Sequence, residues 1–211
     1  MSKVRIKYSK TGRAKYISHL DLTATLQRAL LRAGIKLKYS EGFNPHPYIS
    51  VALPLSVGFE SICEMVDIAV LGDELPDKNL IKLPEGIVID EIYVPTQKFN
   101  DIKWLEFNGK FNYNRKMNDE LVKGINSILS KDSIVISKRT KRGTKDIDIA
   151  PHIKDITICY DEDILISAKI STQEPSLNPT DIINALGENY KPDYVDIRRI
   201  EIYDANMMKF R

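Results

Sequence analysis

His19 and His46 are the residues whose type and setting point most directly to chemistry. His19 follows Ser18, a good helix N-cap, so it is predicted at the first position of a helix, where the dipole favours neutral imidazole. It could act as a general base or, once protonated, donate a hydrogen bond to an anion. It could equally form only a local hydrogen bond. His46 stands between Pro45 and Pro47. The two prolines hold it at low entropic cost, which suits a binding site and also a tight turn.

The third histidine and the two cysteines, residue types that bind metal ions, do not predict a metal site. His152 follows Pro151 and lies near a basic stretch, while Cys63 and Cys159 are far apart within strand-like runs. We interpret both cysteines as buried free thiols, and no pair of these residues has the spacing that zinc or iron requires. The chain is therefore expected to hold no metal and no cofactor of its own.

Two groups of basic residues could contact phosphates. The first alternates Lys3, Arg5 and Lys7 with Val4, Ile6 and Tyr8. Such alternation predicts a strand with one apolar face, and its cations would form a row on the opposite face. The second group lies at 138–145 and consists of Lys138, Arg139, Lys141, Arg142 and Lys145. Each group is either a phosphate platform or a solvated surface.

The element that would position the histidines is a helix over residues 18–33. Ser18 and Asp21 form its predicted cap, and Gly34 ends it. Leucines and alanines recur at helical spacing on one face, flanked by Arg28 and Arg32. Nearby aromatic residues could stack bases, and two or three of them are expected to be buried instead: Tyr8, Tyr16, Tyr39, Phe43 and Tyr48.

The fold expected from the order of elements is α+β, with two tandem ferredoxin-like halves and antiparallel sheets. Residues 1–95 follow the order β-α-β-β-α-β, with a short helix or irregular segment at 75–83. Residues 101–211 repeat this plan, with a basic loop at 138–145 inserted. The two domains of the protein are therefore predicted at 1–95 and 101–211.

Composition narrows the class of protein. The chain has 211 residues, of which 43% are hydrophobic, enough to bury a core. Its net charge is only +2, so an argument for nucleic acid must rest on local clusters. The sequence contains neither a signal peptide nor an apolar run of membrane length. We expect a cytoplasmic protein with no membrane association.

The stretch around the two histidines resembles a known bacterial family. The motifs are YISHLDL at 16–22, RALLRAGI at 28–35, YSEGFNPHP at 39–47 and LPLSVG at 53–58. They are similar to the radical-SAM-associated domain of unknown function, which is encoded beside, or fused to, a cobalamin-binding-type radical SAM protein. The resemblance implies that this nearby protein is a partner. It would carry S-adenosylmethionine, an iron–sulfur cluster and, for its cobalamin-binding type, cobalamin. This chain lacks a CxxxCxxC cluster.

Three functions follow as expectations. In the first, the chain is no enzyme but binds RNA, or another substrate of the translation machinery, and presents it to the radical SAM enzyme. That enzyme would act on tRNA, rRNA or the translation machinery. In the second, it is a metal-independent ribonuclease with the tandem ferredoxin layout of CRISPR-RNA-processing proteins, with His19 and His46 as acid and base. In the third, it is a protein-only adaptor. The expected substrate contacts are Lys3, Arg5, Lys7, Lys15, Arg28, Arg32, Tyr39, Phe43, Asn44, His46, Lys138, Arg139, Lys141, Arg142 and Lys145.

Overall fold

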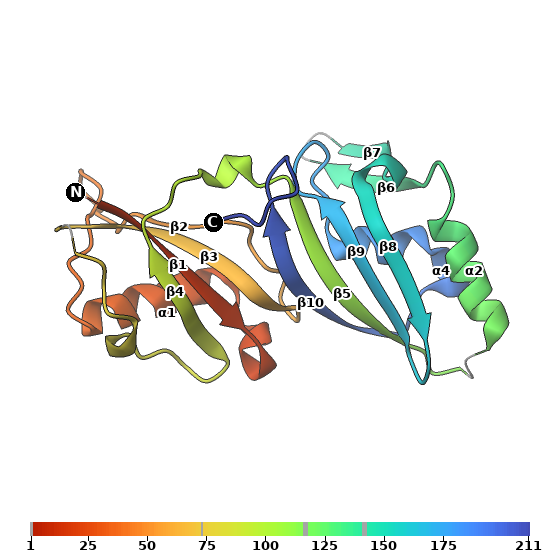
Figure 1. Cartoon of the computed structure of the whole chain (residues 1–211), viewed down its shortest axis with the longest axis horizontal. Helices are drawn as coiled ribbons and strands as arrows, with labels where there is room; N and C mark the ends of the chain where they lie inside the picture. Colours follow the sequence, from red (N-terminus) through yellow and green to blue (C-terminus); the bar gives the residue numbers. More distant parts are fainter. Residues whose placement is uncertain (1, 73, 116–117, 141–142) are drawn as a thin grey trace. The chain divides into compact units, whose positions relative to one another are not determined.

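The chain folds into two units (Figure 1). The computed structural model describes residues 2–72, 74–115, 118–140 and 143–211. Unit 1 comprises Met1–Asp101 together with Phe210–Arg211, and unit 2 comprises Ile102–Lys209. The placement of the last two residues in unit 1 is not indicated by the sequence pattern, and it matters for the site described below.

Unit 1 is a sheet with one long helix on one face (Figure 1). The strands lie in the order β4-β1-β3-β2, and each pair of neighbours is antiparallel. Segment 75–83 contains a three-residue 3-10 turn, so the second helix of a β-α-β-β-α-β unit does not form there. The elements are β1 (Ser2–Lys10), η1 (Gly12–Tyr16), α1 (His19–Arg32), β2 (Ile49–Val51), β3 (Glu60–Val70), η2 (Lys78–Leu80), β4 (Ile87–Tyr93) and η3 (Phe99–Asp101).

Helix α1 forms as its sequence predicts. The Ser18 hydroxyl accepts a hydrogen bond from the Asp21 backbone N–H at 3.2 Å and donates one to the Asp21 carboxylate at 2.7 Å. Gly34, with φ of +77°, follows the helix in the left-handed conformation that glycine adopts readily. The buried stripe of α1 packs with the apolar face of β1. This core contains Leu22, Leu26, Ala29 and Leu30 from the helix and Val4, Ile6 and Tyr8 from the strand.

The main sheet of unit 2 has the strand order β10-β5-β9-β8, again with antiparallel neighbours. When the four strands of each sheet are counted along the chain, the two units have the same order. Strands β6 and β7 form a separate hairpin, which replaces the loop predicted at 138–145. The elements are β5 (Trp104–Asn112), α2 (Asp119–Leu129), β6 (Val135–Thr140), β7 (Gly143–Asp148), η4 (Ala150–His152), β8 (Ile153–Tyr160), β9 (Ile164–Ser171), α3 (Pro179–Ala185), α4 (Gly187–Tyr190) and β10 (Tyr194–Tyr203).

The overall class is therefore mixed α+β, with more sheet than helix, as the sequence predicted at the coarse level. The finer tandem ferredoxin-like layout is not confirmed. No helix in the described part of the chain is long and apolar enough to cross a membrane.

Candidate functional site

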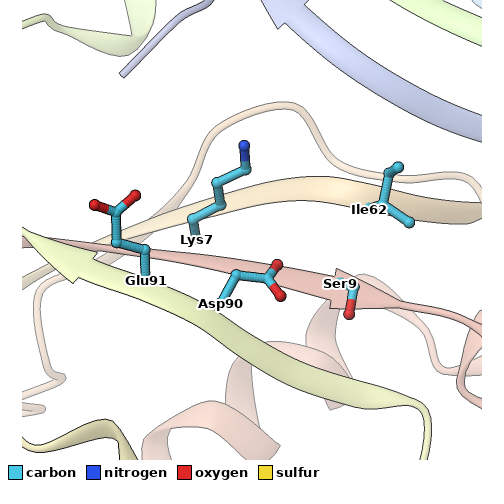
Figure 2. A pocket seen from close by; sticks show the side chains of 5 residues that line it. All are labelled: Lys7, Ser9, Ile62, Asp90 and Glu91. Carbon is cyan, nitrogen blue, oxygen red and sulfur yellow. The ribbon is translucent and has the colours of Figure 1, made fainter.

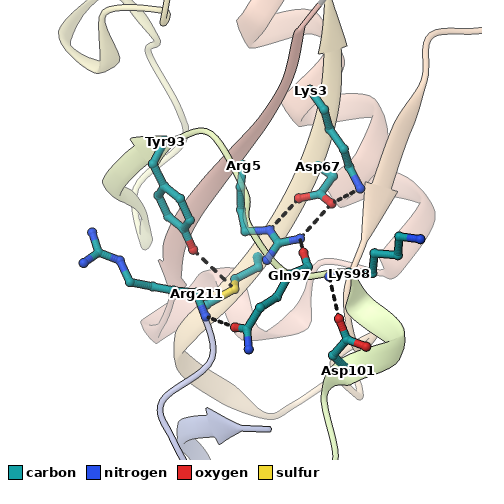
Figure 3. A network of polar contacts seen from close by, with 9 residues as sticks. Lys3, Arg5, Asp67, Tyr93, Gln97, Lys98, Asp101 and Arg211 are labelled. Carbon is teal, nitrogen blue, oxygen red and sulfur yellow. Dashed lines mark hydrogen bonds and ion pairs between the residues drawn. The ribbon is translucent and has the colours of Figure 1, made fainter.

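The cations of β1 lie on the face opposite α1, but they do not form the open row that alternation suggested. Arg5 has no exposed surface. Its register places it opposite Asp67 of β3. Arg5 Nε and Nη2 donate to the two Asp67 carboxylate oxygens at 2.7 and 3.0 Å (Figure 3). The expectation that Arg5 contacts a phosphate is wrong, because a buried guanidinium needs this internal partner.

Aromatic side chains complete the enclosure of Arg5. Its guanidinium carbon lies 4.3 Å from the centre of the Phe99 ring and 5.0 Å from that of Phe210. Nη2 also donates to the Gln97 carbonyl oxygen at 2.9 Å. The backbone N–H of Arg211 donates to the Gln97 side chain at 3.2 Å (Figure 3). Arg5 thus joins residues from β1, the segment after β4 and the C-terminal pair into one structural cluster.

Lys7 faces a different environment, a pocket of about 470 Å³ that also contains Ser9, Ile62, Asp90 and Glu91 (Figure 2). The pairing of β1 with β4 shifts between Lys7 and Tyr8, which leaves Asp90 as an extra residue beside Glu91. Desolvation raises the pKa of the Asp90 carboxyl, and the Lys7 and Lys78 ammonium groups oppose that shift. With two carboxylates beside one lysine, this pocket does not favour a phosphate.

A second hollow in unit 1 brings together basic, aromatic and histidine side chains. This groove has a volume of about 520 Å³. It is lined by Lys3, Lys38, His46, Pro47, Tyr48, Ile49, Ser50, Asp67, Ile68 and Ala69. The groove includes two predicted contacts, Lys3 and His46, and Tyr48, which was named as a ring that could stack on a base. It also includes Lys38, which the sequence analysis did not single out.

Backbone hydrogen bonds to β3 hold the walls of the groove. The N–H of Lys38 donates to the Ala69 carbonyl at 2.8 Å, and the N–H of Ala69 donates to the Tyr48 carbonyl at 3.1 Å. The N–H of Tyr48 donates to the Lys38 carbonyl at 3.0 Å, and Tyr39 bridges to Pro47. The loop that carries His46 is therefore closed at its base by main-chain bonds, in addition to the stiffness of its prolines.

Two lysines and one carboxylate line the groove. Lys3 Nζ lies 2.6 Å from an Asp67 oxygen, and its side chain is 55% exposed. Because Arg5 already balances the Asp67 charge, Lys3 adds a net positive charge. Lys38 Nζ lies 5.7 Å from the centre of the Tyr48 ring. The groove therefore combines surplus positive charge with an aromatic face.

His46 is held by its own loop. Its Nδ1 lies 3.0 Å from Ser40 Oγ and 3.4 Å from the Asn44 carbonyl oxygen. Its backbone N–H donates to Ser40 Oγ at 3.0 Å. Phe43 and Asn44, at the tip of the same loop, are exposed, as is Tyr39. Of the five aromatic candidates only Tyr8 is buried, so the expectation of two or three buried rings is wrong.

His19 is exposed at the first position of α1 and does not share a site with His46. His19 lies two residues after Ile17, whose carbonyl accepts a hydrogen bond from Lys10 Nζ. Lys10 of β1 is paired with Ser61, near the start of β3. His46 belongs instead to the loop fastened near the end of β3. That strand has 11 residues, which span roughly 35 Å. An acid–base pair must reach one substrate group, so the predicted pairing of these histidines is wrong.

Three other predicted contacts lie away from the groove. Arg28 and Arg32 are exposed on α1, and α1 covers the opposite face of the sheet. Arg32 donates to the Lys82 carbonyl at 3.2 Å. Lys15 lies in η1, with its ammonium 5.5 Å from the centre of the Tyr16 ring.

The basic side chains of the β6–β7 hairpin differ in their surroundings: one is bonded to other parts of unit 2 and others are exposed. Lys138 Nζ donates to the Ser176 carbonyl at 2.6 Å and to the Asp181 carboxylate at 2.7 Å, so its role is structural. Arg139 and Lys145 are exposed. Lys141 and Arg142 lie outside the described residues.

Comparison of the sequence with known protein families places the chain in a bacterial family. Residues 3–179 match the profile of a family described as "Uncharacterized protein conserved in bacteria (DUF2344)". The chain belongs to that family. No curated protein matches the sequence.

A solved structure with a TM-score above 0.5 shares its fold at low sequence identity. A chain in "Crystal Structure of a Cbf5-Nop10-Gar1 Complex" is 9% identical, with a TM-score of 0.54, over 94% of this DUF2344 chain and 48% of that chain. This chain thus spans about half the length of that neighbour. A protein described as unknown, from Galdieria sulphuraria, is 10% identical over 94% and 98% of the two chains, with a TM-score of 0.26.

Within residues 2–72, 74–115, 118–140 and 143–211, no three or more His, Cys, Asp or Glu residues group so as to hold a metal ion. Both cysteines are free thiols. Cys63 is buried as predicted, but Cys159 is exposed, which corrects that expectation.

Proposed function

We propose that this DUF2344 protein is a non-catalytic RNA-binding, substrate-presenting partner of a radical SAM enzyme that acts on tRNA, rRNA or the translation machinery. The link to a radical SAM enzyme is supported by the motifs at 16–58. S-adenosylmethionine, the iron–sulfur cluster and cobalamin would all belong to that enzyme.

The observation that carries the RNA proposal is the groove of unit 1. Lys3 and Lys38 could contact phosphate oxygens there, while Tyr48 offers a ring on which an unpaired base can stack. The exposed Phe43 and Tyr39 extend the aromatic surface around the loop. Cations interleaved with aromatic rings are typical of surfaces that bind single-stranded nucleic acid.

The fold is compatible with this proposal. We propose that each unit is a variant of the ferredoxin-like split βαβ fold, with η2 in place of the second helix in unit 1 and the β6–β7 hairpin inserted in unit 2. The matching strand orders β4-β1-β3-β2 and β10-β5-β9-β8 support this assignment. Arg139 and Lys145 on the hairpin provide a second, more diffuse source of positive charge.

The test is fluorescence anisotropy of labelled tRNA and rRNA fragments across a salt series. The Lys3→Ala/Lys38→Ala variant should weaken binding and lower the slope of log K against log[salt], by about 0.7 for each lost phosphate contact on a single strand. Arg28→Ala/Arg32→Ala is the matched control, because it removes the same charge from the opposite face of the sheet.

Two outcomes would contradict the proposal. Absence of binding at low salt would remove the RNA function and leave the protein adaptor. An equal loss in both double variants would show that the groove has no special part in binding.

A further inference from the structure

We infer that Phe43 is an aromatic wedge that inserts between two consecutive unpaired bases of an RNA bound to unit 1. The inference rests on the proposed RNA function and deepens it by naming the residue that enters the RNA and the single-stranded form that it requires. Three features carry it: the exposure of the ring, the rigidity of its loop and the charge of the adjoining groove.

The ring of Phe43 is completely exposed, with a relative accessibility of 111%. The neighbouring rings of Tyr39 and Tyr48 are 37% and 47% exposed. A side chain exposed as fully as Phe43 leaves both faces of its ring open, so a base can stack on each face. The fold gains no burial energy from this ring, and its apolar surface therefore remains available to a ligand.

The loop that carries the ring is closed by Ser40 and His46. The N–H of Ser40 donates to the His46 carbonyl at 2.8 Å, and the N–H of His46 donates to Ser40 Oγ at 3.0 Å. Between these residues, Gly42 has φ of +118°, which glycine adopts readily, and Pro45 fixes its own φ. The backbone thus sets the direction of Phe43 in advance, and binding through this ring orders little of the chain.

The surroundings of the loop favour nucleic acid over a protein partner. The large apolar side chains that residues 36–50 expose are all aromatic: Tyr39, Phe43 and Tyr48. Aromatic rings stack on any base. The groove that adjoins the loop has surplus positive charge, because Lys3 and Arg5 share the single carboxylate of Asp67. A phosphate chain that follows this charge would bring its bases to the loop.

Insertion of a ring between bases requires that the bases separate. An apolar wedge is a known means of opening a base step. The cost is smaller in a single strand than in a duplex, where the base pairs must also be broken. The wedge therefore selects the unpaired loops and ends of an RNA, which are also the parts that proteins recognise most often.

The experiment is fluorescence anisotropy of the full chain with a labelled single-stranded tRNA or rRNA fragment, and with the same fragment annealed to its complement. Phe43→Ala should weaken binding of the single strand about 5- to 150-fold, the equivalent of the ~1–3 kcal/mol that alanine substitution removes from one base–aromatic stack. Phe43→Tyr should retain wild-type affinity, whereas Phe43→Leu should not, because only a ring stacks. The duplex should bind more weakly than the single strand.

A salt series provides a second readout. Phe43→Ala should leave the slope of log K against log[salt] unchanged, because a phenyl ring replaces no counterion, whereas Lys3→Ala should lower it. Tyr194→Ala is the matched control, since it removes an exposed aromatic ring from unit 2 and should leave the affinity unchanged. Unchanged thermal unfolding, which is expected for an exposed ring, shows that each variant is folded.

The outcomes separate this inference from the proposed function. Wild-type affinity in Phe43→Ala, or full affinity in Phe43→Leu, overturns the inference and leaves the RNA function standing. Equal losses in Phe43→Ala and Tyr194→Ala, or tighter binding of the duplex, overturn it in the same way. If the wild type binds neither form of RNA, the inference and the function both fail, and the exposed ring belongs to a protein contact.

Discussion

At the residue scale, Arg5 and Asp67 form a buried ion pair in unit 1. Both side chains are buried, and two hydrogen bonds join them. Phe99 and Phe210 lie against the guanidinium and keep water from it. Loss of Asp67 would leave the buried Arg5 charge uncompensated, and loss of Arg5 would leave the buried Asp67 carboxylate with only the half-exposed Lys3 as its partner. Loss of both would leave neither charge buried.

We therefore expect Arg5→Leu and Asp67→Leu each to lower the free energy of unfolding by about 3–5 kcal/mol. The double variant should lose less than the sum of the two single variants. Urea unfolding of the three variants and the wild type gives the coupling energy. Additive losses would show that the pair does not act as a unit.

Tyr113 gives a prediction for alkaline pH. Burial raises its pKa from 10.0 to about 12, and the Arg115 cation opposes this shift. The folded state therefore holds the phenol proton more tightly than the unfolded state does. Its contribution to stability is fully present below pH 10 and is lost as the pH rises from about 10 through 12.

The measurement compares wild type with Tyr113→Phe in urea unfolding between pH 9 and 12. Stability of the variant should fall less steeply with pH, because the variant has no phenol to ionise at this position. At pH 9 the variant should be less stable, since it lacks the hydrogen bond from the Tyr113 hydroxyl to the Tyr190 carbonyl at 2.7 Å. Parallel pH curves would exclude Tyr113 as the cause.

At the element scale, the β6–β7 hairpin depends on a contact beyond its own two strands. Lys138 donates to the carboxylate of Asp181 in α3. The same carboxylate accepts from the backbone N–H of Asn178 at 2.8 Å and forms part of the capping box of α3. One carboxylate thus serves both the start of the helix and the position of the hairpin.

We expect Lys138→Ala to lower the free energy of unfolding by about 1–2 kcal/mol, between the values for exposed and buried ion pairs. Amide hydrogen exchange should become faster in β6 and β7. Lys145→Ala is the matched control, because Lys145 is the exposed cross-strand partner of Lys138. Equal effects of the two substitutions would refute the anchoring role.

At the scale of the whole molecule, the C-terminal pair belongs to unit 1 although the residues before it belong to unit 2. Phe210 is almost completely buried against Arg5 and packs with Phe99, with ring centroids 6.4 Å apart. Phe210 therefore packs against the first strand of the chain.

Phe210→Ala should consequently lower the stability of unit 1 by about 3–5 kcal/mol, the usual cost of deleting a buried ring. Hydrogen exchange read by mass spectrometry should show faster exchange in β1 and β3 and little change in β9. Uniform acceleration in both units, or acceleration confined to unit 2, would contradict this assignment.

The sequence by itself determined the features that depend on near neighbours. The capped helix α1, the apolar face of β1 and the stiff loop around His46 all follow from residues within a few positions of each other. Only the tertiary structure decided which charged side chains are paired inside the protein and which remain exposed to a ligand. Arg5 meets Asp67, and Lys138 meets Asp181, across long stretches of chain. The separation of His19 from His46 likewise follows from where the loop is fastened to β3. These pairings depend on strand register and packing, which local residue patterns do not specify.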